Sequence, residues 1–353
     1  MDSRNQFFSQ AIPDDAAYMQ RAIDLASLGE GQVSPNPMVG CVIVYQDKII
    51  GEGYHERYGE AHAEPNAIKA VKDQNLLQES TLYVTLEPCA HHGKTPPCAE
   101  LIARHQLKKV VIGALDSNPL VAGKGISLLQ DAGIEVVTGV LEKKVRHQNR
   151  RFFTRMEKKR PYILLKWAQT LDRFIARTNY DSKWISSVLS RQLVHRWRAE
   201  EDAIMVGTHT AHYDNPRLNV RDWTGKDPIR VVIDRNLRLS QALNLFDGTQ
   251  RTLVYNQRQD KTTGLTQWIQ VDAHFDLKAL LEDLHQKRVQ SLLVEGGAAL
   301  LQDFIRQGLW DEARIFTGNL RFGLGIPAPV IPGYPEIRQS LETDTLEVYM
   351  NHE

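Results

Sequence analysis

The segment from His62 to Cys98 contains four side chains whose types and spacing are typical of a catalytic metal site. His62 and Glu64 form an H-A-E motif, and Cys89 and Cys98 end the motifs E-P-C and P-P-C. One imidazole and two thiolates supply three tetrahedral zinc ligands and leave a fourth position open, as a catalytic site requires. Glu64 stands beside these ligands without being needed as one. The segment therefore predicts a metal centre with a carboxylate next to an open coordination position.

Hydrolytic deamination is the chemistry that suits this arrangement. The reaction needs a nucleophilic water at neutral pH, and zinc lowers the pKa of its bound water to about 7. A neighbouring carboxylate can take a proton from water and return it to the leaving amine. Zinc deaminases combine His/Cys/Cys ligands with a non-ligand Glu in this way. We therefore predict that His62, Cys89 and Cys98 bind Zn²⁺ and that Glu64 is the proton shuttle.

A closed, structural zinc site is the alternative interpretation, in which His55, His91 or His92 would supply a fourth ligand. Structural sites more commonly carry paired C-x-x-C motifs, which this sequence lacks. The cysteine spacing also bears on the substrate, because nucleic-acid and nucleoside deaminases typically carry P-C-x-x-C. Here the eight residues A-H-H-G-K-T-P-P separate the two cysteines. Cationic donors from His91 and Lys94 would suit an anionic group such as a phosphate, unless both residues are simply solvated.

Alternating strands and helices are predicted to position this site. Turn residues and apolar periodicity predict helices at about 14–28, from His62 onward, at 96–105 and at 123–133, and strands at 39–45, 81–87, 109–115 and 134–140. Residues 51–60 are predicted to be a loop. This alternation favours an α/β layered sheet. The lone thiol of Cys41 is expected to pack in its core, because a free cysteine behaves as a small apolar residue.

The basic segment EKKVRHQNRRFFTRMEKKR separates the two halves of the chain. We interpret residues 146–160 as a basic linker helix that docks through Val145, Phe152 and Phe153, with an RNA-binding arm as the alternative. In the second half, strands are predicted at 161–170, 202–207, 228–234, 252–256, 291–297 and 311–318, and helices at 186–200, 277–286 and 298–307. The second half is therefore also predicted to be α/β.

Length and composition limit the class of protein. A chain of 353 residues is long for one domain, so we place a deaminase domain at 1–145 and a second domain at 161–353. A formal net charge of zero gives no reason to expect a nucleic-acid partner. Three cysteines suit a reducing cytoplasm rather than a disulfide framework. Because signal-peptide and membrane-span patterns are also absent from the sequence, we expect a cytoplasmic protein without a membrane partner.

The motifs P-N-P-M-V-G-C-V-I-V, G-x-G-Y-H, H-A-E, T-L-E-P-C-x-H-H-G-K-T-P-P-C and V-A-G-K-G-I occur together in this sequence. Together they resemble the bifunctional riboflavin-biosynthesis enzyme, a diaminohydroxyphosphoribosylaminopyrimidine deaminase fused to a 5-amino-6-(5-phosphoribosylamino)uracil reductase. The resemblance runs from about Asp14 to beyond Glu295. It implies a cytidine-deaminase-like α/β/α layered fold for the first half and places Asn36 near the deaminase substrate. Ser117, where a proline is usual, and Pro65, which follows H-A-E, depart from the pattern.

The second half carries further matching motifs, L-K-W-A-Q-T-L-D-R, S-K-W-I-S, R-W-R-A-E, D-N-P-R-L-N-V-R, V-I-D-R and V-E-G-G. The resemblance implies a dihydrofolate-reductase-like α/β fold, NADPH as cofactor, and a homo-oligomer, either dimer or tetramer. It implies NADPH contacts at Ala168, Trp184, Thr210, Asp214, Gly297, Ala298, Ala299, Leu300, Leu301, Gln302 and Asp303. It implies substrate contacts at Ser182, Arg198, Leu218, Arg221 and Glu295.

The chemistry of the residues supports part of this assignment. The G-G pair at 296–297 follows a predicted strand and opens a helix, where free amides can bind a phosphate, although a tight turn would favour the same residues. Arg198 and Arg221 can hold a phosphate bidentately, although isolated arginines are more often surface residues. Hydride delivery needs a proton donor or charge partner nearby, and Lys166 and Asp214 are the candidates. Asp214 is otherwise a structural cap of the D-N-P turn.

The predicted function is therefore a reaction in two steps on a small phosphorylated pyrimidine. The first is zinc-dependent hydrolytic deamination of 2,5-diamino-6-(5-phosphoribosylamino)pyrimidin-4(3H)-one. The second is NADPH-dependent reduction of the ribosyl group to ribityl, which gives 5-amino-6-(5-phosphoribitylamino)uracil. Two other interpretations stay open: a nucleoside, nucleotide or tRNA-base deaminase with an accessory domain, and a zinc-stabilised module whose basic segment 143–160 binds RNA. The cysteine spacing and the zero net charge argue against the first of these.

Overall fold

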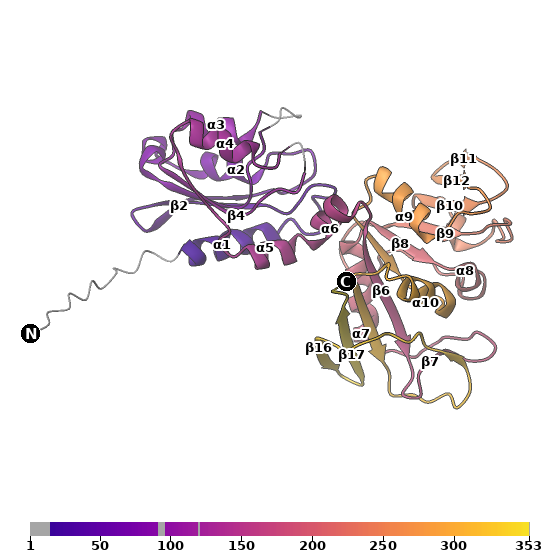
Figure 1. Cartoon of the computed structure of the whole chain (residues 1–353). Helices are drawn as coiled ribbons and strands as arrows, with labels where there is room; N and C mark the ends of the chain where they lie inside the picture. Colours follow the sequence, from indigo (N-terminus) through magenta and orange to yellow (C-terminus); the bar gives the residue numbers. More distant parts are fainter. Residues whose placement is uncertain (1–14, 91–95, 119–120, 353) are drawn as a thin grey trace, which may run out of the picture. The chain divides into compact units, whose positions relative to one another are not determined.

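The computed structural model describes residues 15–90, 96–118 and 121–352. The chain folds into two compact units that divide between Glu157 and Lys158 (Figure 1). Each unit has its own sheet, with a hydrophobic cluster on either face. Among the described residues, no helix combines the length and the apolar composition needed to cross a membrane.

The first unit is built on a sheet whose described strands follow the order β2-β1-β3-β4-β5. The strands are β1 (Gly40–Tyr45), β2 (Lys48–Tyr54), β3 (Thr81–Leu86), β4 (Lys109–Ala114) and β5 (Glu135–Thr138). β1 is antiparallel to β2 and β3, whereas β3, β4 and β5 are parallel to one another. The carboxyl ends of the parallel strands therefore meet at one edge of the sheet, and the chain toward Cys89 leaves from that edge.

Helices cover both faces of this sheet (Figure 1). They are α1 (Asp15–Ser27), α2 (Ala63–Ala70), α3 (Cys98–Arg104), α4 (Lys124–Asp131), α5 (Glu142–Gln148) and α6 (Arg150–Lys158), with a short 3₁₀ helix at Gln74–Glu79. Successive strand residues face opposite sides: Ile43 packs with α2, α3 and α4, whereas Val42 packs with α1, α5 and α6. The predicted α/β/α layering is therefore confirmed. Cys41 is fully buried in the first of these clusters, as predicted.

The predicted loop at 51–60 is wrong in its first part, because β2 extends to Tyr54 and pairs with β1. Gly51 and Gly53 made this stretch look like a turn. Both glycines are instead required by close packing, since an added Cβ would lie 2.5 Å and 2.4 Å from backbone atoms of Ala67. The two glycines therefore allow α2, which carries His62 at its start, to lie directly on β2.

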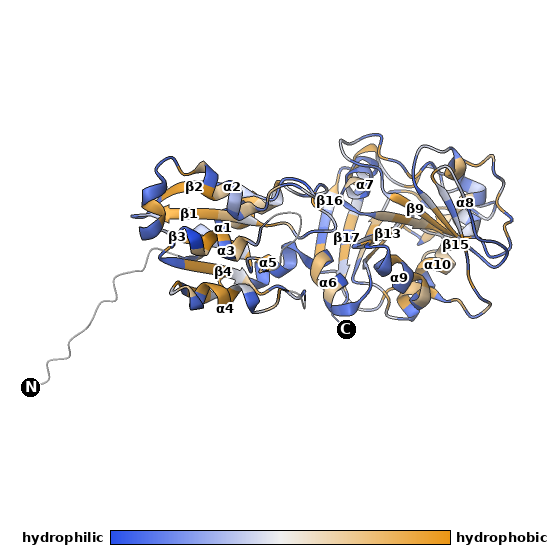
Figure 2. Cartoon of the chain, turned by 90° about the horizontal axis from the view of Figure 1, so that it is seen from above, coloured by the Kyte–Doolittle hydropathy of each residue, from blue (hydrophilic) through white to orange (hydrophobic). Residues whose placement is uncertain are grey.

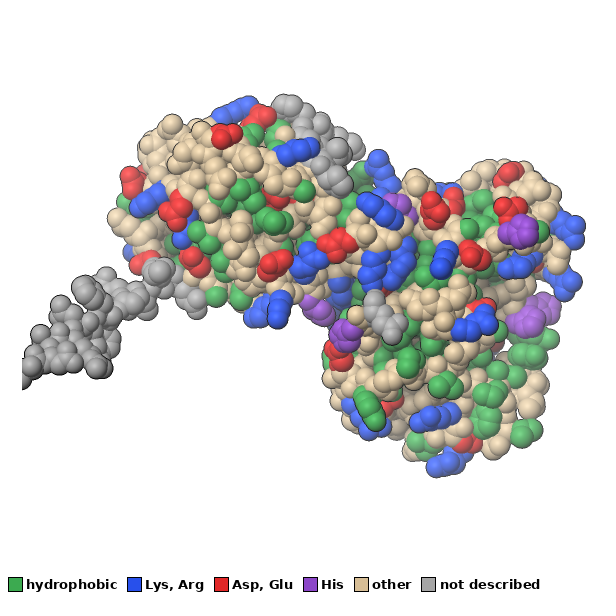
Figure 3. Space-filling model, in the orientation of Figure 1, with side chains coloured by type: hydrophobic (Ala, Val, Ile, Leu, Met, Phe, Trp, Pro, Cys, Tyr) green, Lys and Arg blue, Asp and Glu red, His purple; other side chains and the backbone are tan. Residues whose placement is uncertain are grey.

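The predicted basic linker helix is two helices, α5 and α6, which meet at Asn149. The buried side chain of Asn149 accepts a hydrogen bond from the Met38 amide and donates one to the Met38 carbonyl, each 2.8 Å long. This exchange fixes the helix junction to the chain that follows the P-N-P motif. Val145, Phe152 and Phe153 are buried against the sheet, as expected. Acidic and basic side chains are mixed over the visible surface of the first unit (Figure 3).

The second unit contains a mixed sheet whose described strands follow the order β11-β12-β10-β9-β8-β13-β6-β14-β17-β16. These strands are β6 (Tyr162–Gln169), β8 (Ala203–Val206), β9 (Ile229–Ile233), β10 (Thr252–Asn256), β11 (Lys261–Thr263), β12 (Thr266–Gln270), β13 (Ser291–Val294), β14 (Glu312–Thr317), β16 (Ile337–Leu341) and β17 (Asp344–Met350). From β12 to β14 the neighbours are parallel. Ligands bind beyond the carboxyl ends of the strands in open α/β sheets. A separate ribbon pairs β7 (Phe174–Ala176) with β15 (Ile326–Pro327).

Helices again cover both faces. They are α7 (Val188–Glu200), α8 (Thr208–Asp214), α9 (Leu277–Gln286) and α10 (Ala298–Arg306), with a short 3₁₀ helix at Asn244–Phe246. α9 and α10 pack on one face, and α7 and α8 pack on the other. Apolar residues follow the strands and the inner sides of these helices (Figure 2). The predicted α/β class is confirmed for both halves, and β7, β11, β12, β15, β16 and β17 are additions that the sequence patterns did not predict.

Candidate active sites

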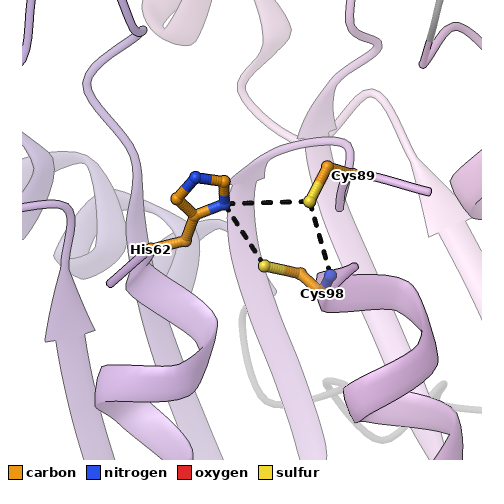
Figure 4. A group of neighbouring side chains, drawn as sticks. All are labelled: His62, Cys89 and Cys98. Atoms are coloured by element: carbon orange, nitrogen blue, oxygen red, sulfur yellow. Dashed lines mark hydrogen bonds between the residues drawn. The ribbon is translucent and has the colours of Figure 1, made fainter. Parts of the chain in front are cut away.

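Three side chains that the sequence placed far apart meet in the first unit (Figure 4). His62 precedes α2, Cys89 follows β3 and Cys98 begins α3. Nδ1 of His62 lies 3.7 Å from Sγ of Cys89 and 3.4 Å from Sγ of Cys98. Zinc bound tetrahedrally at about 2.0 Å from nitrogen and about 2.3 Å from sulfur would hold such atoms about 3.5 Å apart. The donor set therefore fits a zinc ion, as predicted.

Hydrogen bonds favour an anionic sulfur in this group. The amide of Cys98 donates to Sγ of Cys89 over 3.4 Å. The Cys98 thiol and then His62 lower the pKa of Cys89 to about 4, against the opposing effect of burial. The partner thiol of Cys98 has a raised pKa, because the two sulfurs share a proton and Cys98 is buried. A thiolate is the form that binds zinc, so the protein environment prepares the ligands.

Glu64, the predicted proton shuttle, lies beside the zinc-binding side chains. It lies in the first turn of α2, is only 3% exposed, and interacts with the thiol of Cys98. Burial raises the pKa of its carboxyl group, and His62 opposes this effect. A carboxyl group with a raised pKa exchanges protons more readily near neutral pH.

His55 is excluded as the fourth ligand of a closed site. Its Nδ1 lies 3.0 Å from the carbonyl oxygen of Ala61, and its Nε2 lies 3.1 Å from Nδ2 of Asn36. Burial lowers the pKa of His55, so the neutral ring donates through Nδ1 and accepts through Nε2. Both ring nitrogens are therefore used within the protein. The bond to His55 also holds Asn36 next to the zinc ligands, because the His55 and His62 rings are 5.3 Å apart.

The predicted contacts of His91 and Lys94, and the alternative ligand His92, lie outside the described residues. Sequence reasoning did miss Glu87, which stands two residues before Cys89. Its buried carboxylate accepts hydrogen bonds from the amides of Gly123 and Gly125, both 3.1 Å long, at the start of α4. The T-L-E-P-C motif contained this residue, but only the fold shows which amides it binds.

A cavity of 1140 Å³ opens at the carboxyl ends of β6, β8, β9 and β13 in the second unit. This volume exceeds the roughly 300–1,000 Å³ typical of a site for one small ligand. Its lining contains these predicted contacts: Lys166, Ala168, Ser182, Trp184, Arg198, Thr210, Asp214, Leu218, Arg221, Glu295, Gly297, Ala298, Ala299, Leu300, Leu301 and Asp303. Gln302 is the exception, because its side chain turns away and accepts a hydrogen bond from the Val330 amide.

The G-G pair at 296–297 lies at this cavity, between β13 and the start of α10. Gly296 has a φ of 133°, a backbone conformation that L-residues with side chains rarely adopt. An added Cβ at Gly297 would lie 3.0 Å from Oγ1 of Thr210. These glycines therefore leave the first turn of α10 open toward the cavity, and its unpaired amides suit the pyrophosphate of a dinucleotide.

Three charged side chains form a buried cluster in the cavity wall. Glu295 receives two hydrogen bonds from Arg198, of 2.7 Å and 2.8 Å, and lies 3.6 Å from Nζ of Lys166. Burial alone would raise the pKa of Glu295, but Arg198 and Lys166 together lower it to about 2. Burial lowers the pKa of Lys166 more than Glu295 raises it. The ammonium group of Lys166 therefore releases a proton more easily than an exposed lysine does.

Arg198, the predicted bidentate phosphate ligand, uses most of its hydrogen-bond donors within the protein. Its guanidinium uses two N–H groups on Glu295 and one on the carbonyl oxygen of Asn219, 3.2 Å away. Of the five donors of an arginine, at most two are left for a ligand. Arg221 donates one hydrogen bond from Nη1 to Oδ1 of Asn219 over 2.6 Å. Burial and the neighbouring Arg198 lower the pKa of Arg221, so a bound anion would relieve this repulsion.

Asp214 ends α8, and Oγ of Ser182 lies 3.5 Å from its Oδ2. The cap at this turn is Asn215, which has a φ of 40° and hydrogen-bonds Asn244 twice over 2.7 Å. The alternative role of Asp214 as the turn's cap is therefore taken by its neighbour. Sequence reasoning also missed several basic residues that line the cavity, among them His195, Arg217, Arg235 and Arg238. Arg217 and Arg235 stand in the motifs D-N-P-R-L-N-V-R and V-I-D-R, but only the topology shows that these residues line the cavity.

The fold and the two sites define a class of protein, a zinc-dependent deaminase joined to a reductase. Residues 12–114 match the cytidine and deoxycytidylate deaminase zinc-binding region, and residues 161–350 match the RibD C-terminal domain. The riboflavin biosynthesis protein RibD of Aquifex aeolicus is 39% identical over 334 residues, with 93% of each chain covered. That of Actinobacillus pleuropneumoniae is 42% identical, with 86% of this chain and 83% of the other covered.

A solved structure of similar overall fold is the Thermotoga maritima diaminohydroxyphosphoribosylaminopyrimidine deaminase/5-amino-6-(5-phosphoribosylamino)uracil reductase. It has 35% sequence identity and a TM-score of 0.87, with 96% of this chain and 98% of that chain covered. Acinetobacter baumannii RibD gives the same identity and score, with coverages of 96% and 99%. The chain belongs to the family of the bifunctional riboflavin biosynthesis deaminase/reductase RibD. The family confirms the predicted enzyme class, with zinc in the deaminase half and NADPH in the reductase half.

Proposed function

We propose that the chain catalyses two successive steps on one phosphorylated pyrimidine. The first unit deaminates 2,5-diamino-6-(5-phosphoribosylamino)pyrimidin-4(3H)-one, and the second reduces the ribosyl group of the product to ribityl. One observation carries this proposal. A single chain contains both a His/Cys/Cys group beside the buried Glu64 and a reductase cavity lined by the largely buried Lys166. The names of relatives that cover most of both chains support the same substrate.

In the deaminase half, His62, Cys89 and Cys98 hold the metal. Bound zinc supplies the Lewis acidity that makes water nucleophilic at neutral pH. Glu64 accepts a proton on its carboxylate and delivers it to the exocyclic nitrogen, which leaves as ammonia. Asn36, oriented by its contact with His55, offers its amide to the substrate. The burial of Glu64 keeps bulk water from competing for the transferred proton.

In the reductase half, the glycines 296–297 and the first turn of α10 bind the dinucleotide, and Arg221 binds the substrate phosphate. Bound NADPH supplies the hydride. Opening of the sugar ring requires a proton at the ring oxygen, and Nζ of Lys166 lies at the cavity wall to give it. Glu295 holds Lys166 in place across 3.6 Å and keeps its charged form available. Arg198 fixes Glu295 in turn.

A coupled assay tests both halves at once. Without NADPH, we expect the diaminopyrimidine ribosyl phosphate to release ammonia. When NADPH is present, we also expect the nicotinamide absorbance to fall and the deaminated intermediate to gain two mass units. Removing zinc with a chelator should abolish ammonia release but leave reduction of pre-deaminated substrate unchanged, because the two sites use different residues. Ammonia release only from cytidine or tRNA would instead support a nucleoside or tRNA-base deaminase.

Asp214 is a second point at which the proposal can be tested. Asp214→Asn should spare deamination and lower the reduction rate by about tenfold or more, because a hydrogen bond to a charged group contributes about 1.5–3 kcal/mol. Its side chain accepts a long hydrogen bond of 3.5 Å from Oγ of Ser182, so the folded structure should persist. The measurement is NADPH oxidation with pre-deaminated substrate, with Asp260→Asn in an exposed turn as the matched control. Unchanged reduction would remove Asp214 from the reductase site.

Two further features belong to this proposal. We propose a homo-oligomer, a dimer or tetramer, and the support is exposed apolar side chains in the second unit, among them Leu324 and Val330, each 73% exposed. We also propose a cytoplasmic location, because the zinc thiols Cys89 and Cys98 need a reducing compartment. As functional domains we propose 1–145 for deamination and 161–353 for reduction, with the segment 146–160 between them packed on the deaminase unit up to Glu157.

A further inference from the structure

The loop 215–221, which is the first half of the connection from α8 to β9 and carries Arg221, is held by side chains from outside it. Nε of Arg230 donates to the carbonyl oxygen of Arg217 over 2.9 Å. Nη1 of Arg198 donates to the carbonyl oxygen of Asn219 over 3.2 Å. The amide of Val220 donates to the carboxylate of Asp227 over 2.7 Å. These three hydrogen bonds therefore hold the backbone of the loop at Arg217, at Asn219 and at Val220, the residue before Arg221.

His195 holds the next position. The ring lies on α7, lines the cavity and is only 4% exposed. Its Nδ1 accepts a hydrogen bond from the amide of Arg221 over 3.3 Å, and its Nε2 lies 3.4 Å from Oδ2 of Asp222. To accept at Nδ1, the neutral ring must carry its proton on Nε2. This tautomer is also the one that faces the Asp222 carboxylate with an N–H group.

The charges around His195 favour its neutral form. Arg198 lies on the same helix, Arg221 and Asp222 lie on the adjoining chain, and Glu295 follows β13. Burial, Arg198 and Arg221 lower the pKa of the imidazole, and Asp222 and Glu295 oppose them less strongly. Protonation would place an N–H group on Nδ1 against the Arg221 amide. The acceptor would be lost, and the backbone of Arg221 would be released.

We propose that His195 is a positioning residue of the reductase site, whose neutral imidazole fixes the backbone of Arg221 and so sets where the substrate phosphate binds. The inference rests on the proposed function, in which Arg221 binds that phosphate. It predicts that replacing His195 changes the affinity for the substrate and not the affinity for NADPH. It also predicts that the effect passes through Arg221.

Two substitutions distinguish the role of the hydrogen-bond acceptor at Nδ1 from that of the imidazole ring of His195. His195→Asn can present Oδ1 near the position of Nδ1 and does not titrate, whereas His195→Leu has no acceptor. We expect His195→Leu to raise KM for the deaminated substrate on the order of tenfold, the effect of a lost hydrogen bond, with kcat and the KM for NADPH nearly unchanged. His195→Asn should stay within about threefold of the wild type, and His285→Asn on α9 is the matched control.

A pH series supplies a readout that a merely structural role would not change. The substrate phosphate itself titrates with a second pKa of about 6, so we compare the wild type with His195→Asn, in which this contribution is identical. The ratio of the wild-type KM to the His195→Asn KM should rise as the pH falls from 8 to 5. A ratio that is constant with pH would overturn the proposal, even if His195→Leu fails to fold.

A double-mutant cycle with Arg221→Ala completes the test. If His195 acts through Arg221, His195→Leu should have no further effect on KM in the Arg221→Ala background. Equal effects of His195→Leu with and without Arg221 would overturn the inference while leaving the proposed function intact. An unchanged KM in Arg221→Ala alone would overturn the phosphate assignment and the inference together, although deaminase activity would still support the first half of the proposed function.

Discussion

Glu64→Gln is expected to abolish deamination while zinc stays bound. The amide keeps the shape of the side chain but cannot accept and return a proton, so ammonia release should fall by about 10²–10⁴-fold, the usual contribution of general acid–base catalysis. The three ligands His62, Cys89 and Cys98 do not include Glu64, so the zinc content should stay near that of the wild type. Ammonia release and metal analysis on the same sample measure both effects.

The matched control for Glu64 is Glu79→Gln, an exposed carboxylate in the same unit. It should leave ammonia release and zinc content unchanged. Reduction of pre-deaminated substrate by Glu64→Gln should equal that of the wild type. A variant that loses zinc together with activity would make Glu64 a ligand or a structural residue. A variant that keeps full activity would favour a zinc-stabilised binding module over an enzyme.

Glu295→Gln is expected to damage both stability and reduction. It leaves Arg198 and Lys166 buried, with 11% and 15% of their side chains exposed, and without a counter-charge. Removing one partner from a buried ion pair costs about 3–5 kcal/mol of unfolding free energy. Urea unfolding followed by tryptophan fluorescence measures this loss in the second unit alone, because all six tryptophans lie there. NADPH oxidation should fall in the folded protein.

The stability difference at Glu295 should depend on pH in a definite direction. The pKa of Glu295 is lowered from the ordinary 4.5 to about 2. Its ionised form therefore stabilises the fold above pH 4.5, and this stabilisation is lost as the pH falls from 4.5 toward 2. The difference between the wild type and Glu295→Gln should shrink over that interval. An exposed control, Glu282→Gln on α9, should show no comparable change, and an equal difference at pH 7 and pH 3 would contradict the ionised state of Glu295.

Sequence reasoning succeeded where the residue types within a short motif indicate the role. The zinc ligands stand in three such motifs, at the start of α2, after β3 and at the start of α3, and their types indicate the chemistry. Apolar runs likewise gave β3, β4 and β6 within one or two residues. The exception is β2, whose Gly51 and Gly53 obscured the strand pattern because they serve the packing of α2 instead of a turn.

Roles that depend on backbone groups far away in the sequence were not predictable. Glu87 binds amides thirty-six and thirty-eight residues later, and His195 binds an amide twenty-six residues later. No pattern of residue types marks such a bond, because the amide it uses belongs to every residue. The ion pair of Arg198 was not predictable for a related reason: its charge was visible in the sequence, but its partner Glu295 was ninety-seven residues away.

The junction at Asn149 has a consequence for how two enzymes can share one polypeptide. Asn149 forms hydrogen bonds with Met38, and the side chains of Phe152 and Phe153 are buried against the deaminase sheet. The basic segment is therefore a structural part of the deaminase unit. Burying each of these aromatic side chains stabilises the unit by about 1.5–3 kcal/mol. A gene fusion or fission that keeps both enzymes intact would therefore divide the chain after Glu157, nineteen residues beyond Thr138, where the last strand of the deaminase sheet ends.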